Sequence, residues 1–430
     1  MEQARTIQGP TDMRSRVCDV LIVGGGVNGL ATAHQINIAN PNRRVVVAEQ
    51  SPPNNFRASG NNTGTAHAGL YYKPGSMKAA LNQIGKRMLD DFCAKNGILL
   101  DRSGKIVVAR DPRGVADLNT YQGNAIANGC DPQRVRVLGQ DELLERIPVL
   151  NEKTLAGLLV EETFSFPPRE VLAKITEKVD EMGGDIHYNT EVLGFQREGK
   201  EWIVETNQGT FRAKMVINHA GEWADQIAKM AFGEIDWMIL PIRGAYLATK
   251  NRFPDDKKFR ELIYQVPTDP SLPFLDPHAI WHEDGTIHFG PTALPWLKEN
   301  FAMRDKTRAL QKFVRDAIML HLQRGTWKFY LGNPEHAKRE IMNVLSGEQF
   351  AKICQEIFNP NQIEITAADL HFAKAGVRAQ LANRKTGKLS MDFGLDDRGN
   401  FITNKNPGSP GFTAALGLAA LLSRLTESRI

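Results

Sequence analysis

The hydrophobic pattern at the start of the chain is typical of one strand–helix–strand unit. Val17–Val23 is a nearly continuous apolar run, which predicts a parallel strand buried on both faces. A helix is expected over Leu30–Ala39 and should end at Asn40-Pro41, and Arg43–Glu49 predicts the second strand. The chain therefore opens like an α/β nucleotide-binding fold.

Further along, helical periodicity and strand-like runs alternate without a fixed repeat. Helices are predicted over Met77–Asn96, Gln140–Ile147, Val171–Met182, Lys306–Arg324, His336–Leu345 and Gly347–Phe358. Strands are predicted over Lys105–Ala109, Glu201–Glu205, Gly209–Arg212, Met215–Asn218, Trp237–Thr249, Leu262–Val266 and Gly285–Phe289. We expect a discontinuous nucleotide-binding domain from residues 17–80, 150–235 and 365–430, and a mainly β substrate domain from 81–149 and 236–364.

Composition narrows the class of protein. The chain has 430 residues, of which 42% are hydrophobic and 24% charged, as in soluble globular proteins of about two domains. Its net charge of +4 is spread along the chain, which argues against a nucleic-acid partner. Four isolated cysteines form no CxxC pair, so a reducing cytoplasm is expected. The longest apolar run, Phe412–Leu422, is too short to span a bilayer. We therefore expect any membrane contact to be peripheral, at the inner face.

A glycine motif joins the first strand to the first helix. Gly24, Gly26 and Gly29 have the GxGxxG spacing, in which glycine allows a tight turn, a close approach of pyrophosphate and close helix packing. Glu49 ends the second strand, where an acidic side chain can bind the ribose hydroxyls of adenosine. A dinucleotide site is the favoured interpretation; a glycine-rich turn of another α/β protein is the alternative.

Later segments decide between FAD and NAD. The long loop from Ser51 to Pro74 contains Ser59–Gly69 (SGNNTGTAHAG), which is small, polar and suited to backbone contact with a ligand. Asn218–Asp225 is a second strand-to-helix corner. Gly376–Gln380 and Asn406–Thr413 precede an Ala/Leu-rich helix, whose N-terminus can stabilise negative charge on a reduced flavin.

On these residues the chain resembles the D-amino-acid-oxidase superfamily, and within it the FAD-dependent L-2-hydroxyglutarate dehydrogenases (or oxidases). The most specific stretches are Ser59–Ala79, Pro241–Leu247 (PIRGAYL), Asp269–His278 (DPSLPFLDPH), Gly290–Leu294 (GPTAL) and Ala375–Gln380 (AGVRAQ). The chain departs from that family at Asp276-Pro277 and at His219, where a small residue is usual. NNTGTAH and GPTAL are also similar to malate:quinone oxidoreductases. These departures bear on the substrate, not on the flavin.

The resemblance implies a glutathione-reductase-like FAD-binding Rossmann domain with a second, mixed-β substrate domain of the D-amino-acid-oxidase kind. It also implies that FAD contacts residues around the glycine turn, the long loop and the later corners. These are Gly24, Gly26, Val27, Asn28, Gly29, Glu49, Gln50, Ser59, Asn61, Asn62, Thr63, Val192, Ala220, Gly221, Trp223, Gly376, Ser409, Pro410, Gly411, Phe412 and Thr413.

Oxidation of a 2-hydroxy acid needs a base for the hydroxyl proton and a cation for the carboxylate. His67 is the first candidate base, because its loop follows the ribose-binding strand and imidazole has a suitable pKa. Alternatively, His67 binds the backbone or carries a covalent flavin link. His278 is the rival base or carboxylate contact.

Arg378 is the favoured carboxylate ligand, since a guanidinium pairs bidentately with a carboxylate and this arginine stands among small and apolar residues. Arg243 is expected either to bind a second carboxylate or to form an interdomain salt bridge. Tyr246 and Tyr72 are candidate hydroxyl donors. His219, His187 and His371 are interpreted as packing or surface histidines, and no metal-ligand spacing is present.

The sequence thus predicts an FAD enzyme that oxidises L-2-hydroxyglutarate to 2-oxoglutarate and passes the electrons to a quinone or another acceptor. Oxidation of (S)-malate with a quinone acceptor is the alternative, and an amino-acid or sarcosine-type oxidase is the third possibility. A single dinucleotide fingerprint argues against a nicotinamide partner. A flavin-binding module with a regulatory or RNA-modifying role is the alternative from another class.

Overall fold

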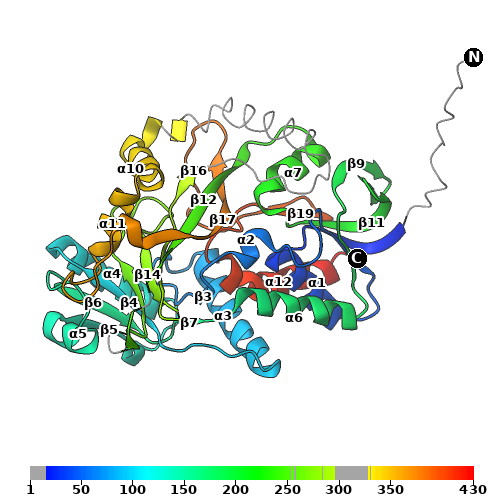
Figure 1. Ribbon diagram of the computed structural model, residues 1–430. Coiled ribbons are helices and arrows are strands. Elements are labelled where there is room, and N and C mark those ends of the chain that lie inside the picture. Colours follow the sequence, from blue (N-terminus) through cyan, green and yellow to red (C-terminus); the bar gives the residue numbers. More distant parts are fainter. Residues whose placement is uncertain (1–15, 252, 256–257, 283, 296–327, 330) are drawn as a thin grey trace, which may run out of the picture.

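The computed structural model describes residues 16–251, 253–255, 258–282, 284–295, 328–329 and 331–430. Within them the chain builds two large β-sheets with helices packed on their faces (Figure 1). The predicted helix Lys306–Arg324 lies outside the described residues.

The first sheet has a parallel core. Its strands follow the order β18 (Leu395–Asp397), β19 (Phe401–Asn404), β11 (Gly209–Asn218), β1 (Arg16–Val23), β2 (Val45–Ala48) and β8 (Asp185–His187). β1 pairs in parallel with both β2 and β11, and it is buried from Val20 to Val23. An antiparallel extension, β9 (Val192–Glu198) and β10 (Glu201–Thr206), continues from β11. Because the carboxyl ends of the parallel strands meet at one edge, the loops that follow them share that edge.

Helices α1 (Val27–Ala39), α3 (Met77–Lys95), α6 (Pro168–Glu181) and α12 (Gly411–Glu427) pack beside this sheet (Figure 1). Close packing of α3 on α12 depends on small residues. A Cβ atom on Gly85 would lie 2.2 Å from the backbone oxygen of Thr413, and one on Gly417 would lie 2.8 Å from that of Leu81. Glycine at these two positions therefore lets the N-terminus of α12 approach the start of α3.

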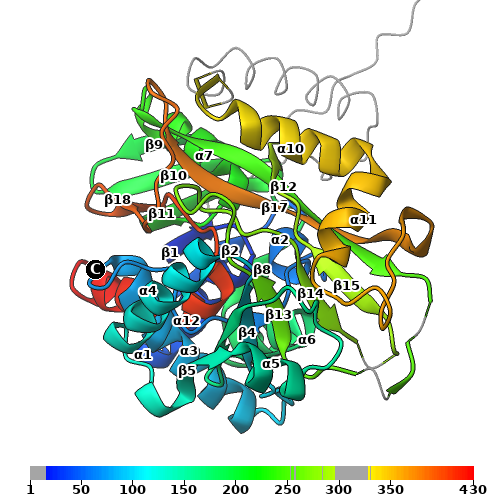
Figure 2. The ribbon, with the colours of Figure 1, turned by 90° about the vertical axis from the view of Figure 1, so that its left-hand side faces the viewer.

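The second sheet is mostly antiparallel. Its strands follow the order β16 (Leu294–Pro295), β12 (Trp237–Thr249), β15 (Ile287–Gly290), β14 (His278–Trp281), β13 (Leu262–Gln265), β4 (Lys105–Ala109), β6 (Ala156–Val160) and β5 (Val135–Gly139). The long β17 (Leu370–Asn383) pairs with the whole of β12, and Figure 2 shows this ribbon running past α10 (Pro334–Leu345). One face of the sheet packs on α5 (Gln140–Arg146) and α11 (Gly347–Gln355), and the other on α4 (Pro112–Ala127) and residues Ala68 and Leu70.

The opening strand–helix–strand unit is found where the pattern predicts it. α1 begins at Val27, immediately after the first two glycines of the motif, three residues earlier than predicted. The two predicted strands Gly209–Arg212 and Met215–Asn218 form one continuous strand, β11. The pattern does not predict α4, β5, β6 or β17.

Strand pairing crosses the predicted domain boundaries. β6 and β17 fall in ranges assigned to the nucleotide-binding domain, yet both pair within the second sheet. α3 falls largely in the range assigned to the substrate domain, yet Leu81, Leu89 and Phe92 pack in the core beside the first sheet. The division into two domains stays a prediction. None of the described helices is both long and apolar enough to cross a membrane.

Candidate active site

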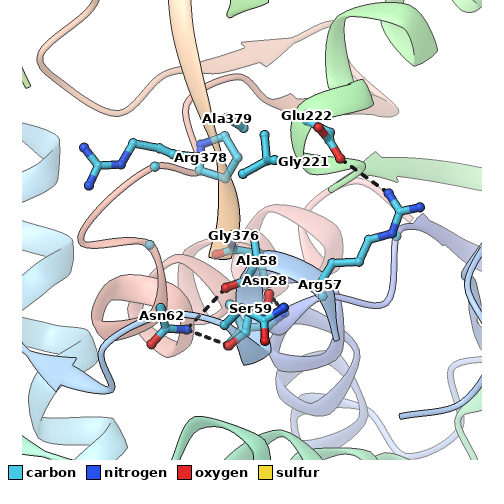
Figure 3. A pocket seen from close by; sticks show the side chains of 18 of the residues that line it. Asn28, Arg57, Ala58, Ser59, Asn62, Gly221, Glu222, Gly376, Arg378 and Ala379 are labelled. Atoms are coloured by element: carbon cyan, nitrogen blue, oxygen red, sulfur yellow. Dashed lines mark hydrogen bonds and ion pairs between the residues drawn. The ribbon is translucent and has the colours of Figure 1, made fainter. Parts of the chain in front are cut away.

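One deep cavity collects residues that are far apart in the sequence. Its walls come from the glycine turn, the loop after β2, the corner after β11, strands β12 and β17 and the start of α12 (Figure 3). Every residue predicted to contact FAD lines this cavity except Gly29. The predicted catalytic residues His67, Tyr246 and Arg378 line it as well, whereas Tyr72, Arg243 and His278 do not.

The glycine turn leaves the N-terminus of α1 open to the cavity. Gly24 has a φ of +106°, and a Cβ there would lie 2.5 Å from the backbone oxygen of His219. A Cβ on Gly29 would lie 1.9 Å from the backbone oxygen of Gly24, which explains why Gly29 packs beneath the turn. At Gly26 a Cβ would approach only the Ser59 hydroxyl, at 3.0 Å. Gly26 therefore leaves room for pyrophosphate beside the positive end of the helix.

The carboxylate of Glu49 is held in a fixed position beside the turn. One oxygen accepts a hydrogen bond from Gly25 N–H at 2.6 Å, and the other accepts one from Ser51 N–H at 2.7 Å. Glu49 and Gln50 both line the cavity. This placement suits an acidic group that binds ribose hydroxyls.

The loop after β2 is shaped by its own asparagines. The Asn62 amide donates to Ser59 O at 2.6 Å (Figure 3). The Asn62 side-chain oxygen accepts from Gly64 N–H at 2.8 Å. The Lys374 ammonium donates to the backbone oxygen of Asn62 at 2.7 Å, which ties the loop to β17. Small polar residues here keep the backbone next to the cavity, as predicted.

The start of α12 closes the opposite side of the cavity. Residues Ser409–Thr413 line it, and Gly411 opens the helix. The helix N-terminus, with its positive dipole end, therefore meets the cavity. Together with the glycine turn and Glu49, this arrangement fits FAD: a pyrophosphate site, a ribose acceptor and a helix end for the flavin ring.

His67 is fixed through its backbone. Its N–H donates to the Thr413 hydroxyl at 3.3 Å, and its carbonyl oxygen accepts from the Asn82 amide at 2.8 Å. Ring atom Nε2 lies 3.5 Å from the Ser409 hydroxyl, whereas Nδ1 is buried without a partner among the described residues. Burial, together with the charges of Lys105 and Arg378, lowers the pKa of His67 to about 3. The imidazole is therefore neutral and able to accept a proton.

The Arg378 guanidinium extends away from Gly376 along the cavity wall (Figure 3). It donates to Pro273 O at 2.8 Å and lies 5.6 Å from the ring centroid of Phe274. No acidic side chain of the described residues pairs with it. Burial lowers its pKa from the ordinary value. An arginine in this setting has free donors for a carboxylate.

Two tyrosines approach the same region. Tyr246 lines the cavity, and the Lys374 ammonium lies 5.4 Å from its ring centroid. Tyr72 lies behind the wall, with the Lys78 ammonium 5.8 Å from its ring. Burial raises the pKa of both phenols, so both keep their protons. Tyr246 is the better placed of the two hydroxyl donors.

Arg243 and His278 are placed elsewhere. Along β12 the side chains alternate between faces, so Ile242, Gly244 and Tyr246 line the cavity while Arg243 lies on the opposite face, 5.8 Å from the ring of Phe372. This position argues against the second-carboxylate role suggested for Arg243. His278 is buried behind the wall, its ring against Tyr246 and stacked on Tyr264.

Several cavity residues were not predicted from sequence. Arg57 and Glu222 form an ion pair at 3.4 Å across two walls (Figure 3). His219, interpreted as a packing residue, lines the cavity, and its Nε2 lies 3.0 Å from the Thr32 hydroxyl. Burial lowers the pKa of His219 to about 3. His187 and His371 lie away from the cavity, and no three metal-ligand side chains gather among the described residues.

Comparison with known proteins agrees with this geometry. The family model described as FAD dependent oxidoreductase (DAO) matches residues 19–425. The L-2-hydroxyglutarate dehydrogenase of Escherichia coli (strain K12) is 31% identical over 94% of this chain and 91% of its own length. That of Indibacter alkaliphilus is 32% identical over 93% of this chain and 96% of its own, and the human mitochondrial enzyme of that name is 28% identical over 96% and 89%.

Solved structures share the fold over almost the whole chain. FAD-bound L-α-glycerophosphate oxidase from Mycoplasma pneumoniae aligns with a TM-score of 0.71 and 23% identity, over 96% of this chain and 95% of its own. Glycine oxidase from Geobacillus kaustophilus aligns with a TM-score of 0.67 and 16% identity, over 97% and 96%. The predicted fold class and the predicted cofactor, FAD, are confirmed. The chain belongs to the DAO family of FAD-dependent oxidoreductases.

Proposed function

We propose that this enzyme oxidises the CH–OH group of L-2-hydroxyglutarate and forms 2-oxoglutarate. The observation that carries the proposal is that one cavity is lined both by a neutral imidazole, His67, and by a guanidinium, Arg378, that has no acidic partner among the described residues. A 2-hydroxy acid supplies what both lack, a hydroxyl proton for His67 and a carboxylate for Arg378. The relatives from E. coli, I. alkaliphilus and human mitochondria carry the name of this activity.

Each residue has a separate task in the reaction. Arg378 binds the carboxylate next to the hydroxyl and so fixes the α-carbon. His67 accepts the hydroxyl proton at a ring nitrogen that stays unprotonated near neutral pH. Tyr246 donates a hydrogen bond that helps to orient the substrate. Bound FAD supplies the two-electron acceptor for the α-carbon hydrogen.

The electron acceptor and the location belong to the same proposal. We propose that a quinone or another acceptor reoxidises the flavin, in a cytoplasmic enzyme with peripheral contact at the inner face of the membrane. The similarity of NNTGTAH and GPTAL to malate:quinone oxidoreductases supports a quinone.

Oxidation of (S)-malate is the second candidate. It is favoured by the position of the GPTAL segment, because Pro291, Thr292 and Ala293 line the cavity. Malate has the same hydroxyl and carboxylate as 2-hydroxyglutarate and differs by one carbon between its carboxylates.

Steady-state assays with both acids and a soluble dye separate these candidates. The proposal predicts a kcat/KM for L-2-hydroxyglutarate at least tenfold above that for (S)-malate, and the reverse order would favour the second candidate. An oxygen-electrode screen with amino acids and sarcosine covers the oxidase alternative. Peroxide release with an amine, and none with either hydroxy acid, would contradict the proposal.

A further inference from the structure

The ammonium of Lys105 is enclosed without an acidic partner. Lys105 begins β4, its side chain is 0% exposed, and Nζ has no hydrogen-bond partner among the described residues. Nζ lies 4.6 Å from the ring centroid of Tyr264 and 5.0 Å from that of Tyr71. Aromatic faces compensate only part of the cost of burying an ammonium group. No described side chain therefore offsets the cost of burying the Lys105 ammonium in full.

Strand register directs Lys105 toward the His67 loop. Lys105 pairs with Leu262 in β13, so Lys105 and Tyr264 lie on the same face of the second sheet. That face packs against Ala68 and Leu70, which directly follow His67. The ring of His278 stacks on Tyr264 with a centroid distance of 4.0 Å and an interplanar angle of 6°. Lys105 therefore belongs to the layer between the second sheet and the loop that carries His67, behind the residues that line the cavity.

Several other polar atoms in this layer also lack partners among the described residues. They are both ring nitrogens of His278, the Tyr71 hydroxyl and Nδ1 of His67. Buried polar groups in native proteins are almost always hydrogen-bonded, so a cluster of unsatisfied atoms indicates a polar group supplied from outside the chain. Since an ammonium has three donors and no acceptor, that group has to be an acceptor.

The surrounding charge indicates an anion. Lys105, Lys374 and Arg378 lie close enough to this layer to lower the pKa of His278, and within the described part of the chain none of them pairs with an acidic side chain. The charges of Lys105 and Arg378 both lower the pKa values of His67 and His278. The two cations therefore both lie near the same two imidazole rings. A 2-hydroxy dicarboxylate carries one carboxylate beside its hydroxyl and a second at its far end, so it offers one anion to each cation.

We propose that Lys105 binds the far carboxylate of the substrate while Arg378 binds the one beside the hydroxyl, so that Lys105 makes the site selective for dicarboxylates. This inference rests on the proposed oxidation of a 2-hydroxy acid. It replaces Arg243, which lies on the wrong face of β12, as the second carboxylate ligand.

The test compares two ligands that differ only at the far end. Glutarate and pentanoate have the same five carbons, but glutarate has a carboxylate where pentanoate has a methyl group. Binding of each to the oxidised holoenzyme is measured by perturbation of the flavin absorbance. The variants are Lys105→Met, which keeps the length of the side chain without its charge, and Lys105→Gln. Lys86→Met is the matched control, because Lys86 is, like Lys105, a buried lysine outside the cavity lining, but it is paired with Glu162 at 2.7 Å.

Wild-type enzyme should bind glutarate about 100-fold more tightly than pentanoate, as expected for a charged hydrogen bond to a buried carboxylate. Either Lys105 variant should reduce that ratio to below about tenfold, with the dissociation constant for pentanoate unchanged within about twofold. Lys86→Met should keep the wild-type ratio. Flavin content and the far-ultraviolet circular dichroism spectrum report folding independently.

An unchanged ratio in a folded, flavin-loaded Lys105 variant would overturn the inference, as would an equal loss of affinity for both ligands. A wild-type enzyme that does not prefer glutarate would overturn it even if no variant folded. Failure of the proposed function looks different: L-2-hydroxyglutarate and L-2-hydroxypentanoate would both leave the wild-type flavin oxidised.

Discussion

A Cβ atom on Gly29 would lie 1.9 Å from the backbone oxygen of Gly24, so the helix and the glycine turn touch where the third glycine of the motif stands. The oxygen that this Cβ would meet belongs to the backbone, so it cannot move aside by a side-chain rotation. At Gly26, by contrast, a Cβ meets only the Ser59 hydroxyl, at 3.0 Å. Two glycines of one motif therefore serve different ends, one the packing of the protein and the other the space for its ligand.

Substitutions at these two positions should have different effects, one on the stability of the protein and the other on FAD binding. Gly29→Ala should lower the free energy of unfolding by about 3 kcal/mol, because helix and turn have to separate. Gly26→Val should stay within about 1 kcal/mol of the wild-type apoprotein but should not bind FAD, because its side chain enters the pyrophosphate space. Urea unfolding and the flavin-to-protein absorbance ratio measure the two effects. A yellow Gly26→Val protein would contradict the assignment of the pyrophosphate site.

Replacing His67 should slow the chemistry and leave the cofactor bound. His67→Asn keeps the backbone bonds to Thr413 and Asn82 but removes the ring that accepts the proton. Flavin reduction by L-2-hydroxyglutarate in stopped flow should slow by about 10²- to 10⁴-fold. Unchanged reduction would transfer the role of the base to His278, with His278→Asn as the matched comparison.

The pH dependence of the wild-type enzyme tests the same residue. Because burial lowers the pKa of His67 to about 3, the base stays unprotonated across pH 5 to 8. The profile of kcat/KM, which reports the free enzyme, should therefore show no acid limb near pH 6.5. An acid limb at that pH, absent in His67→Asn, would show that the base titrates as an ordinary histidine.

Arg378→Lys tests the carboxylate ligand. Lysine keeps the positive charge but loses the planar fork, so KM should rise about 10- to 100-fold with a smaller change in kcat. Steady-state kinetics with L-2-hydroxyglutarate measure this, and kinetics equal to wild type would remove Arg378 from the site. The change should be similar for L-2-hydroxypentanoate, because both acids carry the carboxylate that Arg378 is proposed to bind.

His219 should make the protein less stable in acid. The Thr32 hydroxyl donates to Asn28 O, so His219 Nε2–H donates to Thr32 and Nδ1 faces the amide of Asn404 without a proton. The pKa is about 3 in the folded state and about 6.5 in the unfolded chain, so the unfolded state binds more protons between these values. Stability from this group is complete above pH 6.5 and is lost as pH falls toward 3.

His219→Gln removes this titration and keeps a side-chain amide near Thr32. Between pH 7 and pH 5 the wild type should lose about 2 kcal/mol more unfolding free energy than the variant. Urea unfolding at both pH values measures the difference. Equal losses would show that His219 does not titrate differently in the folded and unfolded states.

Sequence reasoning worked where the signal is local. Gly24, Gly26 and Glu49 were identified because their spacing along one strand–helix–strand unit nearly determines their arrangement in space. Asn62 and Gly64 were recognised as parts of a ligand loop for a similar reason: short polar residues hydrogen-bond their own backbone.

Sequence reasoning failed where the position of a side chain depends on pairing between strands that are far apart in the sequence. β12 was predicted as a strand, but the face on which Arg243 lies follows from its pairing with β17, more than 130 residues away, and β17 itself was not predicted. Lys105 was predicted only as the first residue of an apolar strand. Its burial depends on Tyr71 and Tyr264, which come from other parts of the chain.

The most direct test of the central claim is an anaerobic absorbance titration of the purified enzyme with 2-hydroxy dicarboxylates. We predict a flavin spectrum that bleaches on addition of L-2-hydroxyglutarate, at lower concentration than with (S)-malate, with 2-oxoglutarate formed in equal amount to the flavin reduced. A protein that contains no flavin and takes up none from added FAD, or a flavin that every 2-hydroxy acid leaves oxidised, would contradict the account.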